Sequence, residues 1–261
     1  MPPNIPLRAV SLELEQDQER LSVWLTHAAL AEGTLKGELL LTHRQQPRLY
    51  MLNVDLTRAE LAQLAASIPA WHGRALQGTV SLHTGLLGNW NDPSSLRGDG
   101  WCHATGEHLA ELPLLDRLLR GMLGGIADRL GLATFRKAQI TTIGAQWKVA
   151  RQRVWTDDLR LDGVSGHEPV TLLVRGSVGF DKTLDLVVEP ELSEEMVLRA
   201  PSTSTMAGTL LKAMGGLERA RRLVGRHHVG GTLEKPQYQF EFSLEQLLNQ
   251  VLPGGLNQLF E

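Results

Sequence analysis

The sequence VTLLVRGSVGFDKTLDLVVEP, residues 170–190, decides the fold of this chain. Apolar side chains stand at every second position on both sides of residues 181–183, which is the spacing of half-buried β-strands. The polar step between the two runs is typical of a tight hairpin turn. The stretch therefore predicts two antiparallel strands, and these apolar side chains share one face: Val170, Leu172, Val174, Leu184, Leu186 and Val188.

The same alternation recurs along the chain and predicts further strands at 11–14, 21–25, 35–42, 48–54, 76–82, 139–149 and 153–161. Because Gly, Asp, Asn or Pro separates neighbouring runs, we expect an antiparallel meander. Its apolar face must meet a core, a partner or an apolar ligand. A slip of one residue in the pairing would turn the opposite set of side chains to that face.

Three segments have helical spacing instead: 113–130, 203–224 and 244–252. The first carries an apolar stripe with Pro113 in its first turn, and the last follows Ser243, which forms a capping-box pattern with Gln246. The expected fold is α+β and mostly β, with two or three amphipathic helices. These helices could cover the sheet or lie in a membrane surface, since both need the same stripe.

Composition limits the partners. The net charge is −3 and the pI is about 6.3, so the chain has no global attraction to nucleic acid or to an anionic membrane, although local basic patches remain possible. The single cysteine excludes an internal disulfide framework. No window reaches the ~20 apolar residues of a membrane helix, and the first residues lack a signal-peptide pattern. No low-complexity linker interrupts the chain, so we expect one domain over 1–261.

The motifs of catalysis and metal binding fail in detail. Cys102, His103 and His108 match no zinc signature. GVSGH at 163–167 lacks the last glycine of a nucleophile elbow, and no phosphate-binding loop is present. The adjacent pair Asp157–Asp158 is more typical of a solvated turn than of a catalytic dyad. The sequence therefore predicts a protein that is not an enzyme and that needs no metal or cofactor; an uncharacterised hydrolase is the weakest alternative.

A basic cluster at the end of the second expected helix consists of Arg219, Arg221, Arg222 and Arg226. Cations at this position favour the helix dipole, which is a sufficient local explanation. Contact with anionic lipid headgroups is the second interpretation.

The order of these elements resembles the C-terminal region of the AsmA-like proteins, relatives of TamB in the Gram-negative cell envelope. The resemblance is carried by LRGDGWCHATG, the PLLDRLL helix, the unit ending in LRLDG, the 170–190 hairpin and finally VGGTLEKPQYQF, and it covers roughly residues 76–250. It implies a long curved antiparallel sheet that forms an apolar groove, faces the periplasm and carries phospholipid. No catalytic residues are associated with the family.

Residues 1–75 fit the more degenerate upstream strands of the same family, and 35–64 looks like a sheet repeat followed by a short helix. Full family members begin with a membrane helix and are longer, so we expect a C-terminal fragment or a truncated relative whose full-length form is anchored in the inner membrane. At 231–240, we expect Gly231 to Leu233 to close the groove, Pro236 to interrupt pairing, and Tyr238 and Phe240 to form an aromatic end strand.

We therefore expect a non-enzymatic module that binds phospholipid or another acyl lipid in an envelope lipid-transport system. Each methylene removed from water contributes about 0.8 kcal/mol, so a trough of aliphatic side chains needs no specific ligand residue. The six residues of the 170–190 hairpin named above are the expected lipid contacts. The alternative is a structural or assembly module that engages envelope proteins through its sheet edges without moving lipid.

Overall fold

The structure is a computed structural model and describes residues 7–42, 44, 47–68, 75–107, 109, 139–165, 168–191 and 227–240. The strands are β1 (Leu7–Gln16), β2 (Arg20–Leu30), β3 (Gly33–Thr42), β4 (Leu49–Glu60), β5 (Thr79–Asn89), β6 (Asp92–Thr105), β7 (Gln139–Ala150), β8 (Arg153–Ser165), β9 (Glu168–Gly179), β10 (Leu184–Glu191), β11 (His227–Gly231) and β12 (Pro236–Phe240). The helix α1 (Leu61–Ser67) lies between β4 and β5.

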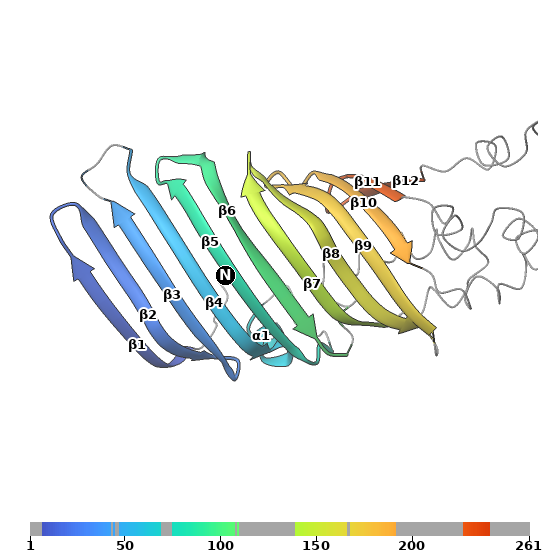
Figure 1. The fold of residues 1–261 in the computed structure, drawn as a ribbon, viewed down its shortest axis with the longest axis horizontal. Coiled ribbons are helices and arrows are strands. Elements are labelled where there is room, and N and C mark those ends of the chain that lie inside the picture. Colours follow the sequence, from blue (N-terminus) through green and yellow to red (C-terminus); the bar gives the residue numbers. More distant parts are fainter. Residues whose placement is uncertain are drawn as a thin grey trace, which may run out of the picture.

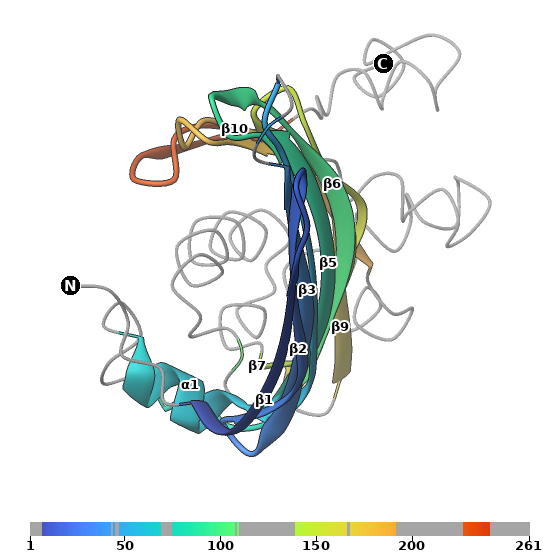
Figure 2. The ribbon, with the colours of Figure 1, turned by 90° about the vertical axis from the view of Figure 1, so that its left-hand side faces the viewer.

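All twelve strands form one sheet in which each strand pairs with its neighbours in sequence, from β1 to β12 (Figure 1). Every pairing is antiparallel, because each strand follows the last through a reversal of the chain. Seen along the sheet, the strands bend into an open arc whose two ends do not meet (Figure 2). The predicted long, curved antiparallel sheet is confirmed.

The β9–β10 hairpin forms where the alternation of 170–190 predicts it. Leu186 lies opposite Gly176 and Val188 opposite Val174, so the apolar positions of both strands share one face. The turn is closed by the Lys182 N–H, which donates to the Gly179 carbonyl at 2.9 Å. Asp181 Oδ1 accepts from the N–H of the residue two positions later at 3.0 Å, an Asx turn of the kind that the polar step predicts.

The C-terminal strands differ from the prediction. Gly231 ends β11 and Pro236 begins β12, and the two residues lie opposite each other in a hairpin. The residues between them form the turn, so Gly231 to Leu233 is not the expected closing strand, and Pro236 opens a strand rather than interrupting one. Gly231 has a φ of 76°, which favours glycine. Within the described sheet β12 pairs only with β11, and a proline is tolerated at the first residue of such an edge strand.

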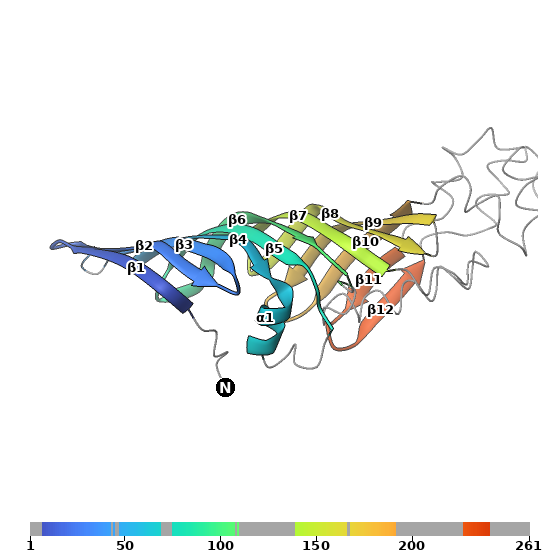
Figure 3. The same ribbon diagram turned by 90° about the horizontal axis from the view of Figure 1, so that it is seen from below.

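One helix is present in the described part of the chain, fewer than the two or three predicted. The three segments for which amphipathic helices are expected, 113–130, 203–224 and 244–252, lie outside the described residues. The helix α1 forms where the pattern of 35–64 predicts a short helix after a strand. It buries Leu61, Leu64 and Ala65 against the sheet, and Figure 3 shows it on one side of the sheet, below β4 and β5.

Candidate functional site

The sheet has one apolar face, and this face lies on the hollow side of the arc. Leu56 of β4 packs in one buried cluster with Leu64 of α1. Figure 2 shows α1 on the inner side of the arc, so we call this side of the sheet the inner face. One row of directly opposed residues on the inner face crosses from β3 to β7: Leu35, Leu56, Leu82, Cys102 and Ala145.

The inner face is unevenly covered. On β2 to β5 its aliphatic side chains are partly exposed, among them Leu25, Leu39, Leu52, Val54 and Leu86. On β7 to β11 many of the corresponding side chains are buried, among them Ile143, Leu161, Leu172, Leu186 and Val229. Trp147, Val154, Leu159 and Val178 are partly exposed, so solvent reaches apolar surface on both halves of the inner face.

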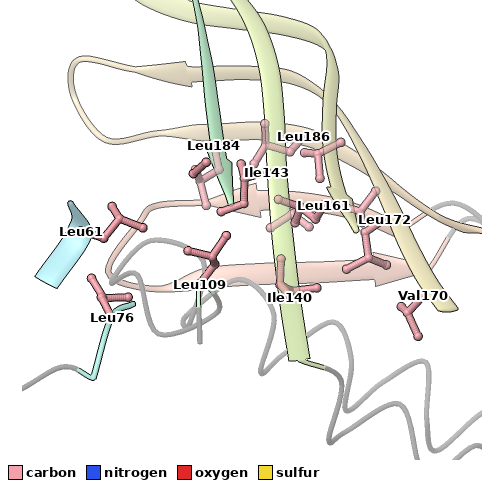
Figure 4. Packing of buried hydrophobic residues seen from close by; sticks show 14 of the residues in the cluster. Leu61, Leu76, Leu109, Ile140, Ile143, Leu161, Val170, Leu172, Leu184 and Leu186 are labelled. Atoms are coloured by element: carbon pink, nitrogen blue, oxygen red, sulfur yellow. The ribbon is translucent and has the colours of Figure 1, made fainter. Parts of the chain in front are cut away.

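The six predicted lipid contacts all lie on the inner face of β9 and β10, and each is 6% exposed or less: Val170, Leu172, Val174, Leu184, Leu186 and Val188. They belong to a cluster that also contains Leu61 of α1 and Leu76 of the following loop (Figure 4). Their shared face agrees with the predicted register, and their role as lipid contacts stays a prediction.

A cavity of about 520 Å³ opens on the inner face over β5 to β10. Its walls are mostly aliphatic and aromatic: Leu86, Leu96, Val149, Val154, Leu159, Leu161, Val174, Val178, Leu186 and Val188, with Trp147 and Phe180. Of the six predicted contacts, three line this cavity and three, Val170, Leu172 and Leu184, do not. Few polar groups reach it, so it favours an apolar ligand without fixing its orientation.

Glycines on the inner face make room for aromatic rings. A Cβ atom at Gly100 would collide with the indole of Trp147, which lies opposite it on β7. A Cβ atom at Gly88 would meet the ring of Tyr50 in the same way. These aromatic rings therefore lie flat against the backbone instead of projecting into the hollow side of the sheet.

The only cysteine of the chain, Cys102, also lines the cavity. Burial raises the pKa of its thiol, because the negative thiolate is less stable away from water. A raised pKa leaves less thiolate at neutral pH, and the thiolate is the reactive form. Cys102 is thus better suited to a wall position than to a nucleophile.

The outer face is polar and carries most of the ion pairs. The carboxylate of Asp55 lies 2.7 Å from His83 Nδ1, and Asp185 Oδ1 lies 3.0 Å from His228 Nε2. A second concavity of about 760 Å³ lies over β4 to β8, with Asn53, Arg97, Asp99, Gln146 and Lys148 in its walls. Met51, Leu87 and Trp155 also line it, so the outer concavity is mixed, whereas the walls of the inner cavity are almost entirely apolar.

The residues weighed for chemistry do not converge. Cys102 lies on the inner face and His103 is exposed on the other side of β6, while His108 lies outside the described residues. Asp158 accepts a hydrogen bond from the Gln146 N–H at 2.8 Å, which is a structural role. Within the described ranges, no three His, Cys, Asp or Glu side chains gather as metal ligands.

The basic cluster of Arg219, Arg221, Arg222 and Arg226 lies outside the described residues.

The prediction from sequence did not include the inner-face residues of β2 to β5 in the lipid-binding surface. Their signal was available, because the alternation at 21–25, 35–42 and 48–54 is as regular as at 170–190. Among the described residues no helix is long and apolar enough to cross a membrane.

Comparison with protein-family models, with curated proteins and with solved structures finds no match to this chain.

Proposed function

We propose that this chain is a non-enzymatic lipid-binding module of an envelope intermembrane phospholipid transport system. In this proposal the inner face is an apolar groove that holds acyl chains. The observation that carries it is the cavity of about 520 Å³ with almost entirely apolar walls, which adjoins partly exposed aliphatic side chains on β2 to β5. A monomeric sheet that keeps such a surface in water needs something to cover it.

The size of the cavity suits one acyl chain. A water molecule takes about 30 Å³ of liquid volume, and a methylene group is of similar size. At that volume a cavity of about 520 Å³ has room for a chain on the order of 17 methylene groups. A long acyl chain therefore fits as a single ligand, and its polar headgroup can stay in solvent, which avoids the cost of burying a charge.

The resemblance to AsmA-like proteins supports the remaining parts of the proposal. It supports a location in the cell envelope facing the periplasm, with an inner-membrane anchor in the full-length protein, and phospholipid as the lipid class. The long unclosed sheet is the architecture that the resemblance implies.

A second function is favoured by a different observation, the free edge of the sheet at β1. Within the described sheet β1 pairs only with β2, and it exposes Leu7, Val10, Leu12 and Leu14, each by 46% or more. An edge strand with exposed apolar side chains is a template for strand addition. This is the alternative in which the chain contacts envelope proteins through a sheet edge without moving lipid.

The test is native mass spectrometry of the purified protein, with Ala145→Trp as the groove variant and Gln146→Trp as its control. Ala145 lines the cavity, and its neighbour Gln146 is exposed on the outer face. These positions are preferred over Val174 and Leu186, which are 3% and 4% exposed, because an acidic residue there would bury a charge and destabilise the fold.

We expect phospholipid to co-purify with the wild type and with Gln146→Trp, and to be reduced in Ala145→Trp, whose indole occupies part of the groove. Circular dichroism checks that each variant is folded. A folded wild-type protein that carries no lipid and takes up none from vesicles refutes the lipid function and favours the edge-contact alternative.

A further inference from the structure

The turns at one end of the strands group aromatic and basic side chains, a pattern separate from the groove. In an antiparallel meander the turns β3–β4, β5–β6, β7–β8 and β9–β10 lie at the same end of the strands, and Figure 1 shows them along the upper side of the sheet, opposite α1. We call the following residues the upper rim: Arg44, Arg48, Leu49, Trp90, Arg151, Arg153, Trp155, Phe180 and Lys182.

Large apolar side chains on the upper rim stand in water. Trp90 is 66% exposed in the β5–β6 turn, and Phe180 is 47% exposed in the β9–β10 turn. Leu49, the first residue of β4, and Trp155, the third residue of β8, are 38% and 39% exposed. Four large apolar side chains at neighbouring strand ends form a row of exposed apolar surface of the kind that marks an interaction site.

The same turns concentrate positive charge. The upper rim carries four arginines and Lys182, against Asp92 and Asp181 in the same turns. The β1–β2 and β11–β12 turns lie at the same end of the strands and add Asp17, Glu19 and Glu234 against Arg20 and Lys235. Of the rim cations, Arg153 donates hydrogen bonds to Ser177 and Thr183, and Lys182 pairs with Glu234. No ion pair joins Arg44, Arg48 or Arg151 to another residue in the described part of the chain. The opposite ends of the strands carry Glu32, Glu60, Glu107 and Glu191, beside Arg8 and Arg58. The chain as a whole has a net charge of −3, so the positive charge of the upper rim comes from an uneven distribution.

Backbone hydrogen bonds hold these tips in place. The Trp90 N–H donates to the Arg48 carbonyl at 2.8 Å, and the Phe180 N–H donates to the Gln152 carbonyl at 2.9 Å. The ring of Trp90 lies edge-on to Tyr50 with centroids 6.3 Å apart, and the guanidinium of Arg153 lies 5.9 Å from the centroid of Trp155. The aromatic and basic groups are therefore presented together by neighbouring turns.

Aromatic and basic side chains in one row suit the surface of an anionic bilayer. Tryptophan has an apolar body and a polar N–H, and it concentrates at the interface between headgroups and acyl chains. Each arginine or lysine near an anionic leaflet gains from its surface potential. Separate tips can enter a deformable layer of headgroups, and positive charge complements its negative charge.

We propose that the upper rim docks this protein on the surface of an anionic phospholipid bilayer, with Trp90 and Phe180 inserted among the headgroups. This goes beyond lipid binding in the groove, because docking needs no lipid in the cavity. The two sites adjoin, since Phe180 also lines the cavity and Val154, the second residue of β8, lines it near the rim. A bilayer at the upper rim would thus lie next to one mouth of the groove.

The experiment is co-flotation of the full chain with vesicles of phosphatidylcholine alone, or of phosphatidylcholine and phosphatidylglycerol in equal parts. One rim variant removes the aromatic tip that does not line the cavity, Trp90→Ser, and its control is Trp101→Ser, which is 44% exposed on the outer face. The second removes charge, Arg48→Ser with Arg151→Ser, and its control is Arg8→Ser on β1, an exposed arginine away from the rim.

We expect the wild type to float with the anionic vesicles and not with the neutral ones. Loss of two rim arginines should weaken vesicle binding about thirtyfold, from the contribution of each cation near an anionic surface. The aromatic variant should also lose binding, and both controls should keep it. Wild-type protein that stays unbound with both vesicles overturns the proposal, and so does equal loss in the rim variants and their controls.

Native mass spectrometry of the same samples separates this proposal from the groove. Rim variants that keep their co-purified phospholipid but no longer float support docking by the rim. A wild type that floats yet carries no lipid leaves the rim proposal supported while refuting the lipid function.

Discussion

The length of the acyl chain is the variable that tests the groove most directly. We consider a series of lysophospholipids with one headgroup and acyl chains of about eight to about eighteen carbons, because each step then adds only apolar surface. Burial contributes about 0.8 kcal/mol per methylene, so the dissociation constant should fall about fourfold for each added carbon. The cavity of about 520 Å³ has room for roughly 17 such groups, so the gain should level off around that length.

Isothermal titration calorimetry measures the series, at concentrations below those at which the longest ligand forms micelles. Ala145→Trp should move the plateau to shorter chains by several carbons, because its indole occupies the cavity that Ala145 lines, and Gln146→Trp should leave the plateau unchanged. A dissociation constant that changes less than about twofold over the whole series contradicts burial of the acyl chain. An unchanged plateau in the Ala145→Trp variant shows that the ligand lies elsewhere.

Three further predictions concern the sheet itself. Gly100→Val should lower the free energy of unfolding by about 1–3 kcal/mol, because its side chain would collide with an indole ring. A Cβ atom at Gly144 meets only His103 Nδ1 at 3.9 Å, an ordinary contact, so Gly144→Ala should be nearly neutral; urea titration measures both variants. Burial raises the pKa of Cys102, so its thiol should react with iodoacetamide more slowly than a free thiol at pH 8 and reach the rate of a free thiol only at higher pH. Bound lipid should slow the reaction of Cys102 further. Equal rates for Cys102 and a free thiol at pH 8 would argue against a buried thiol. Hydrogen bonds within the β9–β10 turn lower the pKa of Asp181. The ionised carboxylate therefore stabilises the fold at pH values above the ordinary pKa of aspartate, and this stabilisation is lost as the pH falls through the lowered pKa. Asp181→Ala should lower Tm at pH 7 and make no difference to Tm in strong acid.

The meander could be predicted because its signal is local. Alternating apolar positions mark a strand wherever one face is buried, and the 170–190 hairpin adds a turn whose polar residues close it. Strand β6, for which no alternating run is predicted, begins at Asp92 and includes Pro93. Its pairing with β7 begins only at Gly98, so Pro93 lies beyond that ladder and its missing N–H leaves no gap.

The broken strand at 231–240 shows where local signals are insufficient. A proline between two apolar runs is compatible with a step in one strand or with the first residue of the next. The second arrangement forms because β12 turns back to pair with β11, with Tyr238 opposite Val229. Which of the two arrangements forms depends on whether a neighbouring strand can pair with residues 236–240.

The sequence by itself determined an antiparallel sheet with one apolar face, because a period of two places alternate side chains on opposite sides whatever surrounds them. Only the tertiary structure decided which side of the sheet is hollow, and that Leu172 is buried while Leu52 is partly exposed. Leu172 shares a buried cluster with Leu61 of α1, far away in the chain. The curvature of the sheet and the burial of its inner face arise from such contacts between residues far apart in the chain, and no local sequence pattern predicts them.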